Sequence, residues 1–143
     1  MSFLLDTNAI SEWQKPRPNR GVLAWMNATD EDSLFLSVVT LAELRYGTER
    51  MAAGGRRVRY EKWLESELPM RFEGRVLPVN PAVADMWGRL VARGAASGRL
   101  INAMDAYLAA TAEVHSLTLV TRNVSHFSLL KSVVNPWTKT PQV

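Results

Sequence analysis

The stretch Phe3-Leu4-Leu5-Asp6-Thr7-Asn8 is the most informative one for the fold, because three apolar residues are followed directly by three polar ones. An apolar run of this length is typical of a strand that is buried on both faces of a sheet. Polar residues directly after it indicate the carboxyl end of that strand. We therefore predict a buried strand over Phe3–Leu5, with Asp6 at its C-terminal edge.

Four further apolar stretches have the character of strands, and segments with helical spacing of apolar residues separate them. The expected strands cover residues 34–39, 75–79, 117–121 and 132–134. The expected helices cover residues 19–27, 40–51, 60–68 and 102–116, and another begins at Asn80-Pro81, where a cap precedes a proline. Strands that alternate with helices predict an α/β fold, with a mostly parallel sheet of four to five strands covered on both faces.

Glycine and proline residues indicate where these helices end. Gly54 and Gly55 follow the helix over residues 40–51, and Pro69 is expected to end the helix over residues 60–68. Residues 94–98 begin and end with glycine, and we expect them to form a flexible loop.

The composition fits one domain and excludes several classes of protein. With 143 residues, 47% of them hydrophobic, the chain has the length of one compact domain, which we expect to span residues 1–143. The absence of Cys excludes disulfides, zinc–thiolate sites and thiol catalysis, and it is consistent with a cytoplasmic location. No targeting segment is visible, and no apolar run has the length of a membrane span, so no membrane partner is expected.

Arginine dominates the basic residues of the chain. The formal net charge is +3, and 13 of the 17 basic residues are Arg. Guanidinium groups bind phosphates and carboxylates in a bidentate manner, which indicates nucleic acid or an acidic protein as a partner. A GC-rich genome produces the same bias, and both interpretations stay open. The five Trp are expected to pack in the core or at an interface rather than to stack on RNA bases.

Three carboxylates and one amide lie near the edge at which parallel sheets bind ligands. Asp6 follows the first strand, and Glu43 lies just after the second. Asp105 lies in the first turn of the helix before the fourth strand, and Asn123 follows that strand. Carboxylates that gather without a cation raise one another's pKa, and Mg²⁺ or Mn²⁺ prefers oxygen ligands. The pattern therefore predicts a metal site suited to phosphoryl chemistry.

Each carboxylate also has an ordinary structural interpretation. Thr40-Leu-Ala-Glu43 has the form of a capping box, in which Glu43 bonds the backbone of Thr40. Asp105 occupies the third position of a helix that Asn102 would cap, and Asp6 would cap a helix of its own. Three unrelated caps need not fall at the same edge of a sheet, and this favours the metal site.

A set of motifs spans nearly the whole chain. They are Leu4-Leu-Asp6-Thr-Asn8-Ala-Ile-Ser-Glu12, Lys15-Pro-Arg-Pro-Asn19, Val22-Leu-Ala-Trp25, Ser37-Val-Val-Thr40-Leu-Ala-Glu43-Leu-Arg-Tyr-Gly47, Asp105-Ala-Tyr-Leu-Ala-Ala-Thr-Ala112, Leu119-Val-Thr-Arg-Asn123 and Asn135-Pro-Trp137. In this order they resemble the motifs of PIN-domain proteins, most closely the VapC-like and FitB-like toxins, also described as plasmid stability proteins.

The resemblance implies a PIN-like three-layer α/β/α sandwich and a Mg²⁺- or Mn²⁺-dependent endoribonuclease. Such a protein is the toxin of a type II toxin–antitoxin pair and cleaves RNA phosphodiester bonds through metal-activated water. A VapB-like antitoxin silences it, in a homodimer or toxin–antitoxin hetero-oligomer that reaches DNA only through the antitoxin. The alternative is a weakly active or non-catalytic PIN module that acts through its antitoxin complex in DNA binding or autoregulation.

The resemblance also assigns residues to roles. The acidic residues of the family map onto Asp6, Glu43 and Asp105, which would bind the metal. The fourth acidic position departs from the family's pattern, because the corresponding segment holds Asn123 and His126. An amide can still orient a water, so Asn123 is a catalytic candidate. His126 could be a general base or a phosphate ligand, but a surface-loop residue is the favoured interpretation.

Polar neighbours of the acids are candidates for hydrogen bonds to the metal ligands or to the scissile phosphate. These neighbours are Thr7, Asn8 and Thr121, which would be equally ordinary as turn residues.

An antitoxin would approach the acidic edge in a particular way. We expect one of its segments to place Arg or Lys beside the carboxylates, because a cation can substitute for the metal charge. The same segment should cover an apolar groove between helices near Tyr46, Met51 and Trp63.

Overall fold

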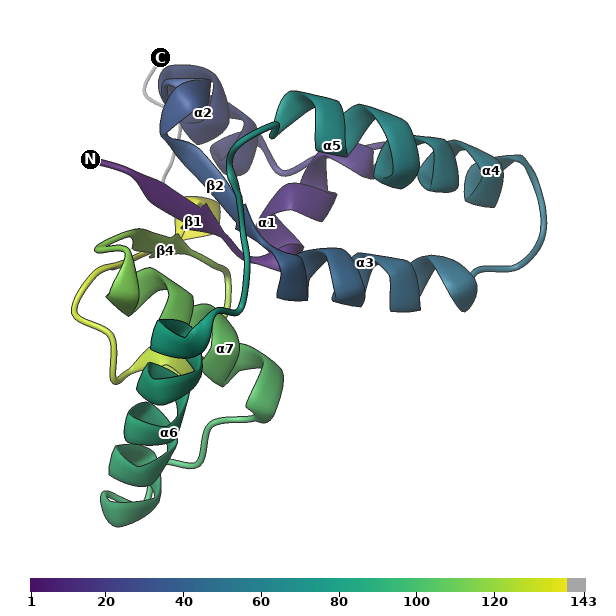
Figure 1. Cartoon of the computed structure of the whole chain (residues 1–143). Helices are drawn as coiled ribbons and strands as arrows, with labels where there is room; N and C mark the ends of the chain where they lie inside the picture. The colour runs from purple at the N-terminus through teal and green to yellow at the C-terminus, as the bar shows by residue number, and fades with distance from the viewer. Residues whose placement is uncertain (139–143) are drawn as a thin grey trace.

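Five parallel strands form the centre of the molecule in the order β3-β2-β1-β4-β5 (Figure 1). The computed structural model of the chain describes residues 1–138. The strands are β1 (Phe3–Leu5), β2 (Leu34–Ser37), β3 (Val76–Leu77), β4 (Thr118–Val120) and β5 (Val133–Val134). The strand order reverses at β1, because β2 and β3 lie on one side of it and β4 and β5 on the other. The carboxyl end of the strand at such a reversal is the usual place for a ligand site.

The helices connect these strands and begin at recognisable caps. They are α1 (Thr7–Ser11), α2 (Arg20–Ala28), α3 (Val38–Glu49), α4 (Gly55–Lys62), α5 (Leu68–Arg71), α6 (Pro81–Ala96) and α7 (Ala103–Val114). The side chains of Asn19, Asn80 and Asn102 each accept a hydrogen bond from the backbone N–H three residues later, at 2.8–3.2 Å. These bonds fix the starts of α2, α6 and α7, as the sequence predicts.

Alternating side chains of the strands divide the interior into two cores. Leu5 and Val120 pack on one face with residues of α1, α2 and α3, and all are buried. Leu4 and Leu119 point to the other face and pack with residues of α6 and α7. In Figure 1, α6 and α7 lie below the sheet and α2 lies above it. The predicted three-layer α/β/α sandwich is confirmed.

The second strand is shorter than predicted. β2 ends at Ser37, whose hydroxyl accepts a hydrogen bond from the N–H of Val39 at 3.0 Å, so Ser37 caps α3. The helix therefore begins at Val38, two residues earlier than expected. This shift places Thr40 inside the first turn of α3, so it cannot be the cap.

Pro69 does not end the fourth helical segment, contrary to prediction. α4 continues into a π-helical turn over Trp63–Glu67, and α5 follows directly. The N–H of Leu68 bonds the carbonyl of Trp63, and Pro69 then occupies the first turn of α5. Pro69 has no N–H to donate, and the wider π-helical turn before it lets the helix continue without that bond.

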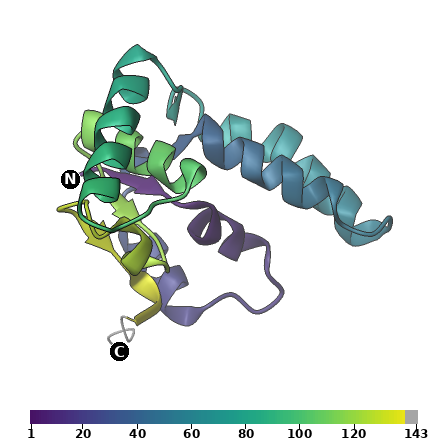
Figure 2. The ribbon, with the colours of Figure 1, turned by 90° about the horizontal axis from the view of Figure 1, so that it is seen from below.

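α3 and α4 leave the sheet together as an arm that Figure 2 shows from below. Arg57 of α4 joins the two helices, since its guanidinium bonds Glu61 at 2.7 Å and Glu49 of α3 at 3.2 Å. The same group also donates to the carbonyl of Met51 at 3.1 Å. These contacts fix α3 and α4 relative to each other, and the arm forms one wall of the cavity described below.

The expected loop over residues 94–98 is mostly helical. α6 extends to Ala96, and the chain turns only at Gly98, which has φ +70°. The N–H of Arg99 then donates to the carbonyl of Gly94 at 2.7 Å, which seats the following loop against the helix. A Cβ atom at Gly94 would lie 2.4 Å from the carbonyl oxygen of Arg99, so Gly94 permits this close approach rather than flexibility.

We expect Gly94→Ala to lower the melting temperature by several degrees, because the added methyl would push residues 99–101 away from α6. The matched control is Gly88→Ala in the same helix, where an added Cβ meets nothing within 4 Å. That change should raise stability by roughly 0.5–1 kcal/mol, the usual gain from replacing a mid-helix glycine. Thermal unfolding followed by circular dichroism measures both, and equal effects would contradict the close approach at Gly94.

Candidate active site

Asp6 is buried directly after β1, and its side chain is 5% exposed. Its Oδ1 accepts a hydrogen bond from the N–H of Thr7 at 2.7 Å, so Asp6 does cap α1. Its Oδ2 accepts from the hydroxyl of Thr121 at 2.7 Å and from the amide of Asn8 at 3.2 Å. Burial raises the pKa of Asp6 and the charge of Asp105 adds to the rise, against the lowering effect of these hydrogen bonds.

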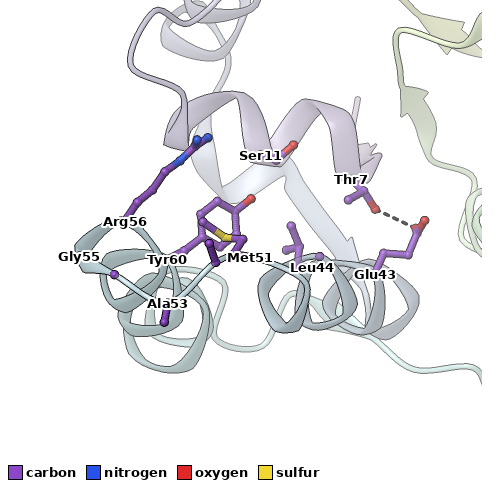
Figure 3. Close-up of a pocket in the computed structure, with 12 residues that line it drawn as sticks. Thr7, Ser11, Glu43, Leu44, Met51, Ala53, Gly55, Arg56 and Tyr60 are labelled. Carbon is purple, nitrogen blue, oxygen red and sulfur yellow. Dashed lines mark hydrogen bonds between the residues drawn. The ribbon is translucent and has the colours of Figure 1, made fainter.

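Glu43 projects from α3 toward α1. Its Oε1 accepts a hydrogen bond from the hydroxyl of Thr7 at 2.8 Å (Figure 3). The capping-box interpretation is wrong, because Ser37 caps α3 and Glu43 lies beyond its first turn. Burial raises the pKa of Glu43, and the charges of Asp6 and Asp105 contribute further.

Asp105 lies in the first turn of α7 and is tied to its cap. Its N–H donates to the side-chain oxygen of Asn102 at 2.8 Å, and the amide of Asn102 donates back to Oδ2 at 2.9 Å. The capping interpretation of Asp105 is therefore correct. The same residue nevertheless raises the pKa of both Asp6 and Glu43 through its charge, so the three carboxylates share one electrostatic environment.

The three carboxylates are chemically suited to a hard divalent cation, although they lie too far apart to coordinate one together. Carboxylate oxygens are the ligands that Mg²⁺ and Mn²⁺ prefer, and a cation would relieve the repulsion among Asp6, Glu43 and Asp105. Within residues 1–138, however, no three His, Asp or Glu side chains stand close enough together to form a metal-binding group. The chemistry of the residues therefore fits the metal, and side-chain rotation would be needed for shared coordination.

The segment after β4 brings His126 to the site, whereas within residues 1–138 the side chain of Asn123 makes no hydrogen bond to the carboxylates. The N–H of Asn123 donates to the hydroxyl of Thr121 at 3.0 Å, and residue 123 is exposed. The 3₁₀ turn η4 (Val124–Phe127) places Nδ1 of His126 3.2 Å from Oδ2 of Asp105. The expectation that His126 is only a surface-loop residue is thus incomplete. The apolar Phe127, which is 1% exposed and anchors this turn, is the one sequence signal for it.

The three polar neighbours of the acids make the contacts expected of them. Thr7 bonds Glu43, and both Asn8 and Thr121 bond Asp6. The side-chain oxygen of Asn8 also accepts from the N–H of Arg122 at 3.3 Å, which ties the end of β1 to the end of β4. These bonds orient Asp6 and Glu43 when no cation is bound.

A cavity of about 650 Å³ separates α1 from the arm of α3 and α4 (Figure 3). Thr7 and Glu43 lie at one end, and Arg56 lies at the other, with Leu44 and Met51 between them. We call this cavity the arm groove. The expected groove is thus found at Met51.

The other two residues expected to line this groove do not do so. Tyr46 is 65% exposed and lies outside the lining, whereas Trp63 is 5% exposed and packs in the core.

Comparison with known proteins identifies the family. The family model for the PIN domain matches residues 3–129. The chain belongs to the PIN-domain family. This PIN domain is 42% identical over 136 residues to the VapC ribonuclease Y4jK of Sinorhizobium fredii, covering 94% of this chain and 97% of the relative. It is also 41% identical over 137 residues to toxin FitB of Neisseria gonorrhoeae, covering 94% and 98% of the two chains.

Solved structures agree with the sequence relatives. A structure of FitAB bound to an IR36 DNA fragment superimposes with a TM-score of 0.90 at 36% identity, covering 96% of this PIN domain and 97% of that chain. The crystal structure of FitAcB from Neisseria gonorrhoeae gives a TM-score of 0.89 at 38% identity, covering 96% and 99%. In the part of this PIN domain that the structure describes, no helix has both the length and the apolar character to cross a bilayer.

Proposed function

We propose that this PIN domain is a metal-dependent endoribonuclease and the toxin of a type II toxin–antitoxin pair. The carrying observation is the group of Asp6, Glu43 and Asp105 at the carboxyl end of the sheet, where burial and the neighbouring carboxylates disfavour the charges of Asp6 and Glu43. A folded protein keeps such a group when a cation or substrate makes use of it. Relatives named VapC ribonuclease and toxin FitB support the same function. The proposal includes a single domain over residues 1–143 and a cytoplasmic location.

Asp6, Glu43 and Asp105 would hold one or two Mg²⁺ or Mn²⁺ ions. When bound, such an ion neutralises phosphate charge and lowers the pKa of water, which supplies hydroxide near neutral pH. Thr121 and Asn8 keep Asp6 oriented toward the open edge of the sheet, and Thr7 does the same for Glu43. The hydrogen bonds of Asn102 and His126 engage Oδ2 of Asp105 and leave Oδ1 for a ligand.

Cleavage of a labelled single-stranded RNA by the purified protein tests this function. Cleavage should require Mg²⁺ or Mn²⁺, stop in EDTA, and leave 5′-phosphate and 3′-hydroxyl ends. Cleavage that persists in EDTA would contradict the metal, and no cleavage at any metal concentration would contradict the ribonuclease. The non-catalytic alternative gains no support from the site, because all three carboxylates and their hydrogen-bond partners are present.

The proposed partner is a VapB-like antitoxin that occupies the arm groove and brings DNA binding to the complex. The superimposed FitAB structure is bound to a DNA fragment, which supports contact with DNA through an antitoxin. Homodimers or toxin–antitoxin hetero-oligomers are the proposed assembly. Glu43 at one end of the groove suits an Arg or Lys of the antitoxin, and the apolar lining suits a short apolar segment.

Met51→Glu should weaken antitoxin binding at least about tenfold, because it buries a new carboxylate in the lining of the arm groove. The control is Met70→Glu on α5, where the side chain is 76% exposed and outside the groove. Calorimetric titration with the antitoxin encoded by the adjacent reading frame measures both variants. Equal affinities would place the antitoxin elsewhere.

Asn123→Asp should tighten Mg²⁺ binding and lower the Mg²⁺ concentration needed for RNA cleavage. The change adds a fourth carboxylate near the group, and the three present bring three negative charges against four positive charges for two Mg²⁺ ions. His126→Asp tests the other placement of the missing acid, beside Asp105. If titration calorimetry finds neither variant tighter than wild type, the fourth position does not belong to the metal site in this chain.

A further inference from the structure

A second, smaller cavity lies beside His126, which contacts Asp105. It has a volume of about 290 Å³, and its walls are residues 98–101, which join α6 to α7, together with Ser125, His126, Ser128 and Leu129. We call it the Arg99 subsite. His126 both lines this cavity and contacts Asp105 at 3.2 Å, so the cavity begins one side chain away from the proposed active site.

The wall that carries Arg99 is held in place rather than mobile. The N–H of Arg99 donates to the carbonyl of Gly94 at 2.7 Å, and the N–H of Gly98 donates to the carbonyl of Ala95 at 3.3 Å. Gly94 allows this contact because it has no Cβ. A backbone held in this way is already ordered, which lowers the entropy lost when a ligand binds.

Two side chains of this loop lack the contacts that would explain them as structural residues. Leu100 is 90% exposed, which leaves its side chain free to contact a ligand. Arg99 is exposed and forms no ion pair with any residue between 1 and 138. An unpaired guanidinium beside an apolar side chain provides one group for a phosphate and one for a base.

We propose that the Arg99 subsite binds one nucleotide of single-stranded RNA next to the scissile phosphate, with Arg99 on a backbone phosphate and Leu100 against the base. The inference rests on the proposed ribonuclease function and assigns its substrate a direction across the site, past Asp105 and His126. A cavity of this volume lies at the lower end of the range of about 300–1,000 Å³ for small-molecule sites, which suits a nucleotide better than a protein segment. The hydroxyls of Ser125 and Ser128 provide donors and acceptors for a ribose.

The test compares Arg99→Gln and Leu100→Ser with matched controls at exposed positions outside the subsite. Arg59→Gln on α4 removes the same charge, and Met70→Ser on α5 removes a comparable apolar side chain that is 76% exposed. The probe is a short fluorescein-labelled single-stranded RNA of random sequence. Its cleavage is followed in Mg²⁺, and its binding is followed by anisotropy in EDTA at several salt concentrations.

Arg99→Gln should raise KM roughly three- to tenfold with kcat unchanged, because it touches RNA beside the scissile bond and not the reacting atoms. The slope of log affinity against log salt should fall by about 0.7, the value for one phosphate contact on a single strand. Leu100→Ser should raise KM by roughly threefold through the lost base contact, with no change in the salt slope. Both controls should behave like wild type.

Several results would overturn the subsite, and they are distinct from failure of the proposed function. If wild type cleaves the RNA and both variants keep its KM and salt slope, the subsite does not bind RNA and the ribonuclease stands. If the variants lose affinity for the antitoxin alone, the surface belongs to the protein partner and the inference is wrong. If wild type neither cleaves nor binds the RNA, both the function and the subsite fail.

Discussion

Asp6→Asn should lower the rate of RNA cleavage at least about 100-fold while the protein stays folded. Loss of a hydrogen-bond partner of a metal ligand costs about 10–100-fold in affinity or activity, and a ligand itself should reach the upper end. Asn is as good a helix cap as Asp, so α1 keeps its cap, and the change removes the charge together with the acceptor that Oδ2 offers to Asn8 and Thr121. Steady-state cleavage at saturating Mg²⁺ measures the loss.

The control for this change is Asp85→Asn, which removes the same charge from α6. Asp85 is exposed and forms a surface ion pair with Arg89 at 2.8 Å. Its loss should leave cleavage unchanged, since exposed pairs contribute little. Asp105→Asn should behave like Asp6→Asn, and an Asp6→Asn protein that cleaves RNA as fast as the Asp85→Asn protein would remove Asp6 from the catalytic group.

The carboxylate group could be predicted because its members follow directly from strand order. Asp6 ends a three-residue buried strand, and the parallel pairing of β1 with β2 and β4 brings Glu43 and Thr121 to the same edge. The hydrogen bonds of Thr7 and Thr121 then arise from residues beside those strand ends. The residue types at the strand ends and the order of the strands thus indicate the same position for these side chains, which is why sequence alone predicts that they lie near one another.

Features that depend on the turn of a helix could not be predicted in the same way. The cap at Ser37 moves the start of α3 by two residues, and this decides that Glu43 faces Thr7 rather than Thr40. The π-helical turn at Trp63–Glu67 carries the helix past Pro69, so the helix end that this proline predicts does not occur. Hydrogen bonds of single residues determine where these helices begin and how they wind, and the spacing of apolar residues does not predict those bonds.

The contact of His126 with Asp105 illustrates the same limit. A histidine in a short polar segment is typical of a surface loop, and only the burial of Phe127 bends η4 back toward α7. Gly94 shows the opposite error, because a glycine at this position predicts a loop, whereas it lies within α6. Its actual role is to let the backbone of Arg99 approach α6. In both cases a tertiary contact outweighs the local preference.

Asp6→Asn should also make the metal-free protein more stable near neutral pH. Burial and the neighbouring carboxylates raise the pKa of Asp6 and Glu43 in the folded state above their unfolded values. The folded state therefore binds protons more tightly, so the stability that these two groups contribute is present at low pH and is lost as pH rises through their raised pKa values. With both groups ionised in EDTA, removing the charge of Asp6 should raise the melting temperature by roughly 2–4 °C, the shift given by about 1 kcal/mol.

Divalent metal should reverse the order of the melting temperatures of wild type and Asp6→Asn. Binding to the folded state alone stabilises wild type by about 2.7 kcal/mol when the free metal is 100 times its dissociation constant, and Asp6→Asn loses most of that gain. Melting curves in EDTA and in Mg²⁺, between about pH 4 and pH 8, should therefore cross: the variant is more stable without metal, and wild type is more stable with it. In EDTA the advantage of Asp6→Asn should shrink toward acid pH, where wild-type Asp6 is already protonated. If Asp6→Asn and wild type melt together in EDTA and shift equally in Mg²⁺, the repulsion among Asp6, Glu43 and Asp105 is not what the metal relieves.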